Sequence, residues 1–180
     1  MKELSLHLLD IAENSISAGA SHVKISINEN IVENQLIMSV KDNGKGMTPE
    51  MVQRIIDPFT TSRTTRKVGL GIPLLKAAAE MCNGFLSISS QPGNGTEIIV
   101  QFQHDHIDRM PIGDIAATML HLVVGSPDIH WTFTHQVNEN VFEFDDQFLK
   151  EELDGIPFSE PEVLSFIRNE LTTGINSIYQ

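Results

Sequence analysis

The chain has 180 residues, of which 41% are hydrophobic, and this allows one domain of ordinary size with a small appendage. Its net charge of -12 argues against nucleic-acid binding, because neutralising phosphates takes a surplus of lysine and arginine. The single cysteine excludes an internal disulfide framework, and no stretch approaches the roughly 20 apolar residues of a membrane span. We therefore expect a cytoplasmic protein with neither nucleic acid nor membrane as a partner.

The first 103 residues alternate between helical and strand-like patterns. Apolar residues recur at helical spacing near the N-terminus, and two alternating apolar segments after them predict a hairpin. Thr48 and Pro49 mark the start of a second helix, and Asn83-Gly84 marks the end of a third. In chain order we predict helix 3–18, strands 21–28 and 34–42, helix 48–56, an irregular loop 57–68, helix 69–84, and strands 85–90 and 96–102.

The character of the chain changes at His104. Eight acidic residues and a single lysine occupy residues 143–162. We therefore predict a small acidic α+β module over residues 104–180, whose role the sequence does not indicate. Within it the patterns predict helix 114–124, strands 129–136 and 140–145, and helices 146–153 and 161–174.

Two polar residues of the first helix are candidates for metal chemistry. Asp10 and Asn14 are four positions apart and so lie one above the other on one face. An amide oxygen there could ligate Mg²⁺ and a carboxylate could orient water. The alternative is an ordinary solvated helix face.

Three glycine-containing turns suit different parts of a nucleotide. Asp42 ends a strand and enters a turn with Gly44 and Gly46, where a carboxylate could accept a hydrogen bond from an adenine amino group. Gly69-Leu70-Gly71 opens a helix, whose first N–H groups are available to phosphate oxygens. Thr96 opens the last strand of this half and could reach a water beside Asp42. Taken singly, each is also a common turn signal.

Five segments in this order resemble the N, G1, F, G2 and G3 boxes of the GHKL superfamily: AENSISAGA, DNGKGM, DPFTTSR, VGLGIPLLK and GNGTEIIVQF. The first two are most similar to mismatch-repair ATPases and the next two to histidine kinases. The resemblance implies an α+β fold, the two-layer α/β sandwich called the Bergerat fold, with a mixed, mostly antiparallel sheet. It also implies ATP and Mg²⁺ as ligands and an ATP-binding domain over residues 1–103, with 104–180 as the appendage.

The resemblance assigns roles residue by residue. Asn14 would bind Mg²⁺ and Asp42 would read adenine. The remaining nucleotide-binding residues would be Gly44, Gly46 and Met47 beside the base, Thr60, Thr61 and Arg63 in the lid, Gly69, Leu70 and Gly71 at the phosphates, and Thr96 at the adenine.

Two departures from the family pattern bear on activity. Hydrolysing members carry a glutamate four residues before the magnesium asparagine, and this chain has the shorter Asp10 there, which makes it a weak candidate for the general base. The box with Asn14 begins almost at the N-terminus, so we expect no phosphoaccepting histidine helix of the sensor-kinase type.

These residues leave three functions open. The first is an Mg-ATP-binding regulatory domain that acts as a nucleotide-gated switch or protein kinase on a partner protein, as anti-sigma-factor kinases of the superfamily do. The second is a slow ATPase with Asp10 as base, and the third a degenerate association module. A homodimer is also open, because either a second copy or the C-terminal module must cover an exposed edge strand.

Overall fold

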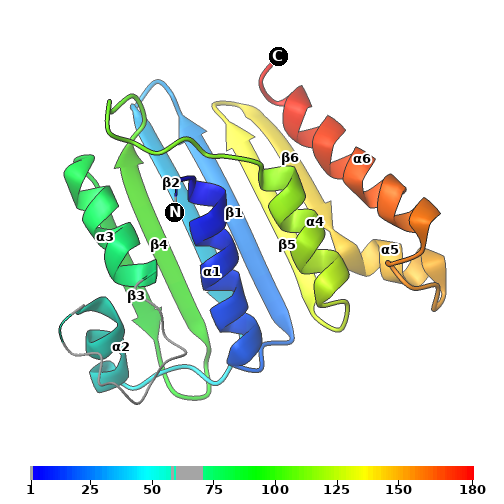
Figure 1. Cartoon of the computed structure of the whole chain (residues 1–180), viewed down its shortest axis with the longest axis horizontal. Helices are drawn as coiled ribbons and strands as arrows, with labels where there is room; N and C mark the ends of the chain where they lie inside the picture. The colour runs from blue at the N-terminus through cyan, green and yellow to red at the C-terminus, as the bar shows by residue number, and fades with distance from the viewer. Residues whose placement is uncertain (1, 58, 60–70) are drawn as a thin grey trace.

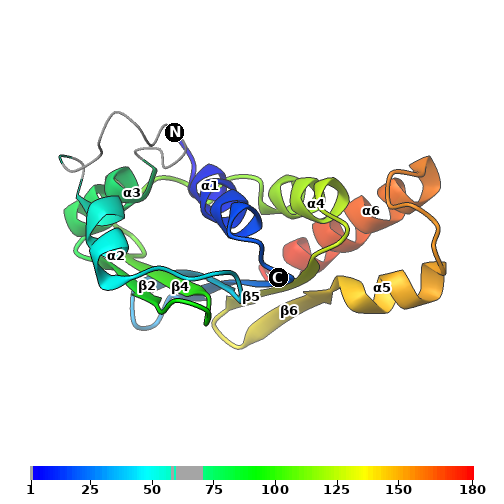
Figure 2. The same ribbon diagram turned by 90° about the horizontal axis from the view of Figure 1, so that it is seen from below.

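The computed structural model describes residues 2–57, 59 and 71–180 and has two layers (Figures 1 and 2). One layer is a six-stranded sheet, and α1, α3, α4 and α6 lie over one of its faces. The predicted α+β sandwich is therefore confirmed. The helices are α1 Leu4–Ser17, α2 Pro49–Ile56, α3 Gly71–Met81, α4 Ile115–Gly125, α5 Asp146–Leu153 and α6 Pro161–Ser177. The strands are β1 His22–Asn30, β2 Gln35–Asp42, β3 Phe85–Ser90, β4 Thr96–Gln103, β5 His130–Val137 and β6 Asn140–Asp145.

The sheet is mixed and mostly antiparallel, as predicted. Its strand order is β3-β4-β2-β1-β5-β6, and only β1 and β5 pair in parallel. Asp42 at the end of β2 pairs with Val23 on one side and with Thr96 on the other. The register thus places the end of β2 beside the first residues of β4, although 54 positions of chain separate Asp42 from Thr96.

Local sequence signals set the bounds of the helices near this point. Thr48 caps α2 by accepting a hydrogen bond from the Met51 N–H at 3.3 Å, and Pro49 follows at the first helical position. Asn83 takes the left-handed conformation, with φ of 56°, directly after α3. The expected cap and stop residues therefore act as predicted.

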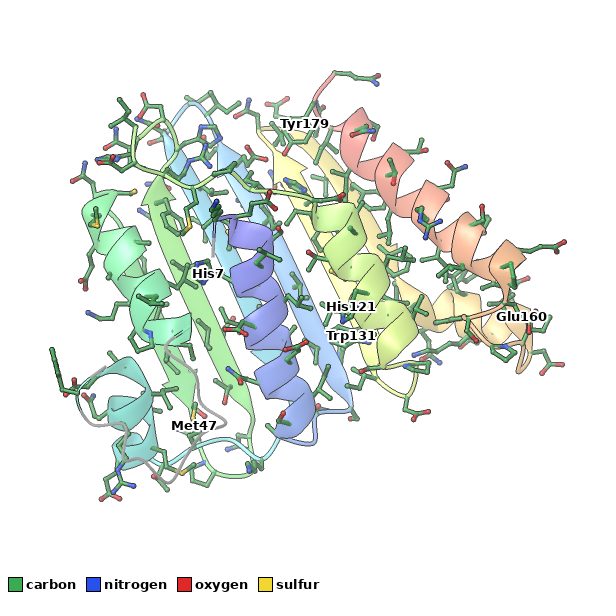
Figure 3. The ribbon with its side chains drawn as sticks, viewed as in Figure 1. His7, Met47, His121, Trp131, Glu160 and Tyr179 are labelled. Atoms are coloured by element: carbon green, nitrogen blue, oxygen red, sulfur yellow. The ribbon has the colours of Figure 1, made fainter. Side chains whose placement is uncertain are left out.

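The core lies between the helices and one face of the sheet. Alternate residues of β1 point into it, so that Val23, Ile25 and Ile27 are buried while Lys24 is exposed. Trp131 of β5 is fully buried, and its indole N–H donates to the Ser126 carbonyl at 3.0 Å (Figure 3). Phe133 and Phe144 are buried as well, so the aromatic residues of β5 and β6 belong mainly to the core.

The C-terminal segment continues the sheet of the first half. β5 lies parallel to β1 along eight residue pairs, from His22 with His130 to Glu29 with Val137. The free edge of β1 is therefore covered by the chain's own C-terminal residues, one of the two coverings that the sequence left open. Within the residues that the structure describes, no helix is both long and apolar enough to cross a membrane.

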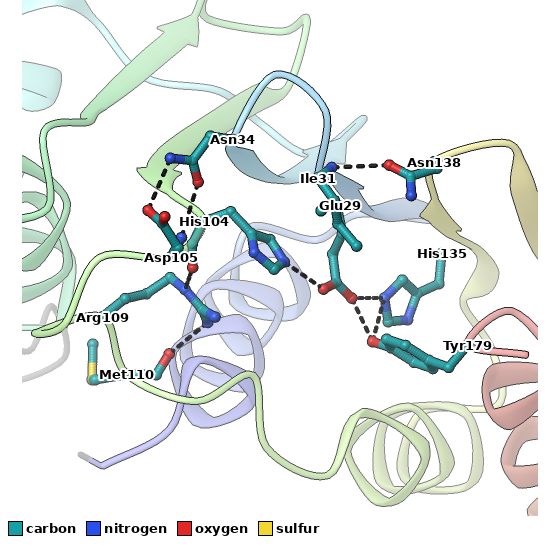
Figure 4. Close-up of polar contacts among 10 residues, drawn as sticks. All are labelled: Glu29, Ile31, Asn34, His104, Asp105, Arg109, Met110, His135, Asn138 and Tyr179. Carbon is teal, nitrogen blue, oxygen red and sulfur yellow. Dashed lines mark hydrogen bonds and ion pairs between the residues drawn. The ribbon is translucent and has the colours of Figure 1, made fainter.

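A buried acidic group ties four distant segments together at the far end of β1 (Figure 4). Glu29 is 4% exposed and lies 2.9 Å from both His104 Nε2 and His135 Nε2, and the Tyr179 hydroxyl donates to it. Arg109 holds the connector beside it by donating to the His104 carbonyl at 2.5 Å. Burial acts to raise the pKa of Glu29, but hydrogen bonds from His135, Tyr179 and His104 outweigh it and lower the pKa to about 2.

We predict that Glu29 makes stability dependent on pH in the acid range. Its folded pKa of about 2 lies below the ordinary 4.5, so its contribution of about 3 kcal/mol is present above pH 4.5 and is lost as pH falls towards 2. The free energy of unfolding should differ most between wild type and Glu29→Gln at neutral pH, and the gap should shrink below pH 4.5. Glu33→Gln, in the next turn, is the control, and a gap that does not change with pH would contradict the account.

Candidate functional site

A cavity of about 530 Å³ opens between α1, α2 and the ends of β2 and β4. Five of the residues predicted to bind the nucleotide, Asn14, Asp42, Gly46, Met47 and Thr96, lie on its wall. They come from α1, β2, the turn after β2, and β4, so folding brings them together from remote parts of the chain. The whole lining comprises Ile11, Asn14, Ser15, Ser17, Ala18, Val40, Asp42, Lys45, Gly46, Met47, Met51, Ile55, Ile72, Thr96 and Ile98.

The Asp42 carboxylate is fixed by three donors. Its Oδ1 accepts the backbone N–H of Gly44 at 2.9 Å and that of Thr96 at 3.2 Å, and its Oδ2 accepts the Ser15 hydroxyl at 2.6 Å. Oδ1 is therefore occupied by two backbone donors, whereas Oδ2 keeps a lone pair for a further one. The site presents a pre-oriented acceptor inside a cavity with mainly aliphatic walls.

The glycines around Asp42 are required by close backbone approach. A Cβ on Gly46 would lie 1.9 Å from the Gln91 carbonyl oxygen, and one on Gly95 would lie 1.9 Å from the Asp42 carbonyl oxygen. Both glycines also have positive φ, 69° and 78°. The turn after β2 thus packs closely against the turn between β3 and β4, and Gly46 and Asp42 both line the cavity beside this contact.

Hydroxyl groups complete the polar edge of this cavity. The Ser90 hydroxyl lies 2.8 Å from that of Thr96 and accepts the Met47 N–H at 2.8 Å. Met47, at the end of the glycine turn, is therefore bonded to β3. The predicted Thr96 is part of a network that joins the turn to both β3 and β4.

A smaller polar cavity of about 220 Å³ adjoins the first and shares Ile11, Asn14, Ser17 and Ile72 with it. Asp10, Glu13 and Gly71 complete its lining. Gly71 is the first residue of α3, and a Cβ there would lie 2.2 Å from Asp10 Oδ2. Asn14 consequently stands at the junction of an apolar cavity and a carboxylate-rich one.

Comparison with known proteins identifies the family. Residues 2–106, more than half of the chain, match the family described as histidine kinase-, DNA gyrase B-, and HSP90-like ATPases. The chain belongs to this ATPase family. The fold of this family supports ATP binding.

Relatives of the ATPase-family domain include two kinases of Bacillus subtilis. Sporulation kinase D is 31% identical over 93 residues, which cover 52% of this chain and 18% of that protein. Sensor histidine kinase YxdK is 30% identical over 107 residues, covering 56% of this chain and 33% of that protein. The chain thus matches only a third or less of the length of these kinases.

Solved structures share the fold at low sequence identity. The MutL ATPase domain of Aquifex aeolicus, complexed with ADP, has a TM-score of 0.51 and 15% identity, with 96% of this chain and 70% of that one covered. The N-terminal domain of a DNA repair protein has a TM-score of 0.57 and 12% identity, with 81% and 52% covered. The likeness shows the fold of the ATPase-family domain, and it includes the C-terminal segment.

Some predicted site residues lie outside the described residues, namely Thr60, Thr61, Arg63, Gly69 and Leu70. Of the others, Gly44 is buried beside the cavity, where a Cβ would lie 2.9 Å from the Ala18 Cβ. Sequence reasoning missed the roles of Ser15 and Ser90. Ser15 could have been found because it is a polar residue on the otherwise apolar face of α1. No feature of the sequence indicates the role of Ser90.

We predict that Gly46→Ala destabilises the ATPase-family domain by about 3 kcal/mol, because the new Cβ would add a clash with Gln91 to the strain of positive φ. Gly93→Ala is the matched control. Gly93 has φ of 81° but open space where its Cβ would be, so only about 1 kcal/mol is expected. Denaturant unfolding measures the free energy of unfolding of both variants. An equal loss of stability in the two would contradict the close packing of Gly46 against Gln91.

Proposed function

We propose that this domain binds Mg-ATP and acts as a nucleotide-gated switch or protein kinase on a partner protein. The observation that carries the proposal is the shared cavity of Asn14 and Asp42, with the Asp42 carboxylate already oriented. We assign nucleotide binding to residues 1–103, whereas the acidic residues 104–180 extend the same sheet and are not assigned to the nucleotide.

Adenine suits the larger cavity for a chemical reason. Its flat apolar faces would pack between Ile98 and Met51, and its exocyclic amino group would donate to Asp42 Oδ2. Guanine carries a carbonyl oxygen at the corresponding ring position, and this oxygen would repel the carboxylate. The geometry therefore favours ATP over GTP.

The smaller cavity suits the metal end of the ligand. A triphosphate that reached Asp10 and Glu13 would be repelled by their carboxylates unless a cation lay between them. Oxygen ligands are those that Mg²⁺ prefers, and the Asn14 amide offers one at the junction of the two cavities. Mg²⁺ would supply charge neutralisation there, and the N–H groups at the start of α3, near Gly71, would face phosphate oxygens.

The relatives favour a kinase over a simple ATPase, since both Bacillus subtilis proteins are kinases. A slow ATPase is the second candidate, because Asp10 lines the smaller cavity, where its carboxylate could orient water. Its side chain is one methylene shorter than the glutamate of hydrolysing members, and this favours slow or absent hydrolysis.

We predict that Asp42→Asn weakens ATP binding at least about tenfold, since a hydrogen bond to a charged group contributes about 1.5–3 kcal/mol. The asparagine must keep its oxygen towards the two backbone N–H groups of Gly44 and Thr96, so its amide NH₂ would face the adenine amino group. Asn14→Ala should remove the Mg²⁺-dependent part of the affinity. Calorimetric titration with and without Mg²⁺ measures both effects.

Asn169→Ala on α6 is the matched control and should bind as wild type does. Equal ATP binding by wild type, Asn14→Ala and Asp42→Asn would reject the proposal. Phosphate release from the same samples separates the candidates, because a slow ATPase should release phosphate and lose that activity in Asp10→Asn.

A further inference from the structure

The negative charge of the protein is concentrated at one end of the molecule. Residues 139–180 hold ten acidic and two basic residues, so this quarter of the chain carries a net charge of -8 out of -12. They form β6, α5 and α6 at the edge of the sheet remote from α2 and α3 (Figure 1). Figure 3 places Glu160, just before α6, at the opposite end of the molecule from Met47 of the nucleotide cavity.

Exposed phenylalanines lie within this acidic end. Phe166 of α6 is 54% exposed, and the buried face of that helix is formed by Ile167, Leu171 and Ile175. Glu162 and Glu170 lie one turn away from Phe166 on either side, on the face turned to solvent. An aromatic ring thus stands between two carboxylates in the middle of an exposed helix face.

The same arrangement recurs on α5. Phe148 is 65% exposed, and Glu151 and Glu152 follow it by three and four positions, on the next turn. Two helices of the acidic end therefore present a phenylalanine bordered by carboxylates. We define the acidic aromatic surface by Glu162, Phe166 and Glu170 of α6.

The two cations of this region do not neutralise the acidic aromatic surface. Lys150 pairs with the buried Asp146 at 2.9 Å and donates to the Ile129 carbonyl at 2.6 Å. Arg168 is two positions from Phe166, about 200° round the helix, and lines a hollow between α4 and α6. Among the described residues no salt bridge reaches Glu162 or Glu170, and their charge can therefore attract an external partner.

We propose that the acidic aromatic surface binds a basic segment of a partner protein whose apolar side chains cover Phe166. Charge complementarity selects a basic occupant and excludes nucleic acid and anionic lipid. Aromatic anchors inside a polar rim are the usual source of affinity in protein interfaces, and lysine or arginine can also stack on the rings. The basic segment would belong to the partner of the proposed switch or kinase, and only this assignment rests on the proposed function.

The experiment measures fluorescence anisotropy of a synthetic amphipathic peptide with lysine on one face and leucine on the other, without nucleotide. Wild type should bind it, and the variant Glu162→Gln/Phe166→Ser/Glu170→Gln should bind at least about tenfold more weakly. The matched control is Val32→Ser/Glu33→Gln, which removes an 84% exposed apolar side chain and an adjacent acid in the β1–β2 turn and should bind as wild type does. A peptide with serine in place of leucine should bind about tenfold more weakly to wild type.

The proposal is overturned if the surface variant binds the lysine-leucine peptide as tightly as wild type does, or if the control variant loses as much affinity as the surface variant. It is also overturned if wild type binds the lysine-serine peptide as tightly as the lysine-leucine peptide. Self-association of wild type that the surface variant abolishes would assign the surface to a second copy and also overturn it. A circular dichroism spectrum and a melting temperature equal to those of wild type show that the surface variant is folded. Failure of wild type to bind ATP would reject the proposed function but would not affect the peptide measurement, which is made without nucleotide.

Discussion

The candidate site depends on the immobilised carboxylate of Asp42. Its three donors belong to α1, to the turn after β2 and to β4, so a single side chain joins three elements at the mouth of the cavity. The glycines of the neighbouring turns serve the same constraint, since a side chain on Gly46 or Gly95 would push the turns apart. A fixed acceptor costs little reorganisation when a ligand arrives, and this supports the proposal that the Asp42 carboxylate selects the base.

The two proposed sites lie at opposite ends of the sheet. The nucleotide cavity lies at α1, α2 and the ends of β2 and β4, whereas the acidic aromatic surface lies beyond β6. Between them the sheet is continuous, and on its helical face α1 packs on α4 and α4 on α6. Packed helices can couple nucleotide binding at one site to partner binding at the other, provided that the helices can adopt two alternative packing arrangements.

Local signals in the sequence predicted most of the elements. Alternating apolar residues predicted the strands, and Thr48 and Pro49 predicted the start of α2. The resemblance to the five family boxes implied that Asn14 and Asp42 serve one nucleotide, and the two residues do line one cavity. What the sequence could not predict depends on pairing between remote segments. The parallel pairing of β1 with β5 has no local signature, and the cluster around Glu29 unites residues 29, 104, 135 and 179. In the sequence, Ser15 is one small residue on the buried face of a helix. Only the fold shows that its hydroxyl contacts Asp42.

The most direct test of the central claim is a crystal structure of the protein with Mg²⁺ and a non-hydrolysable ATP analogue. The account predicts the adenine amino group within hydrogen-bond distance of Asp42 Oδ2 and the Asn14 amide oxygen among the ligands of the metal. A nucleotide bound elsewhere, or an adenine ring turned away from Asp42, would contradict it.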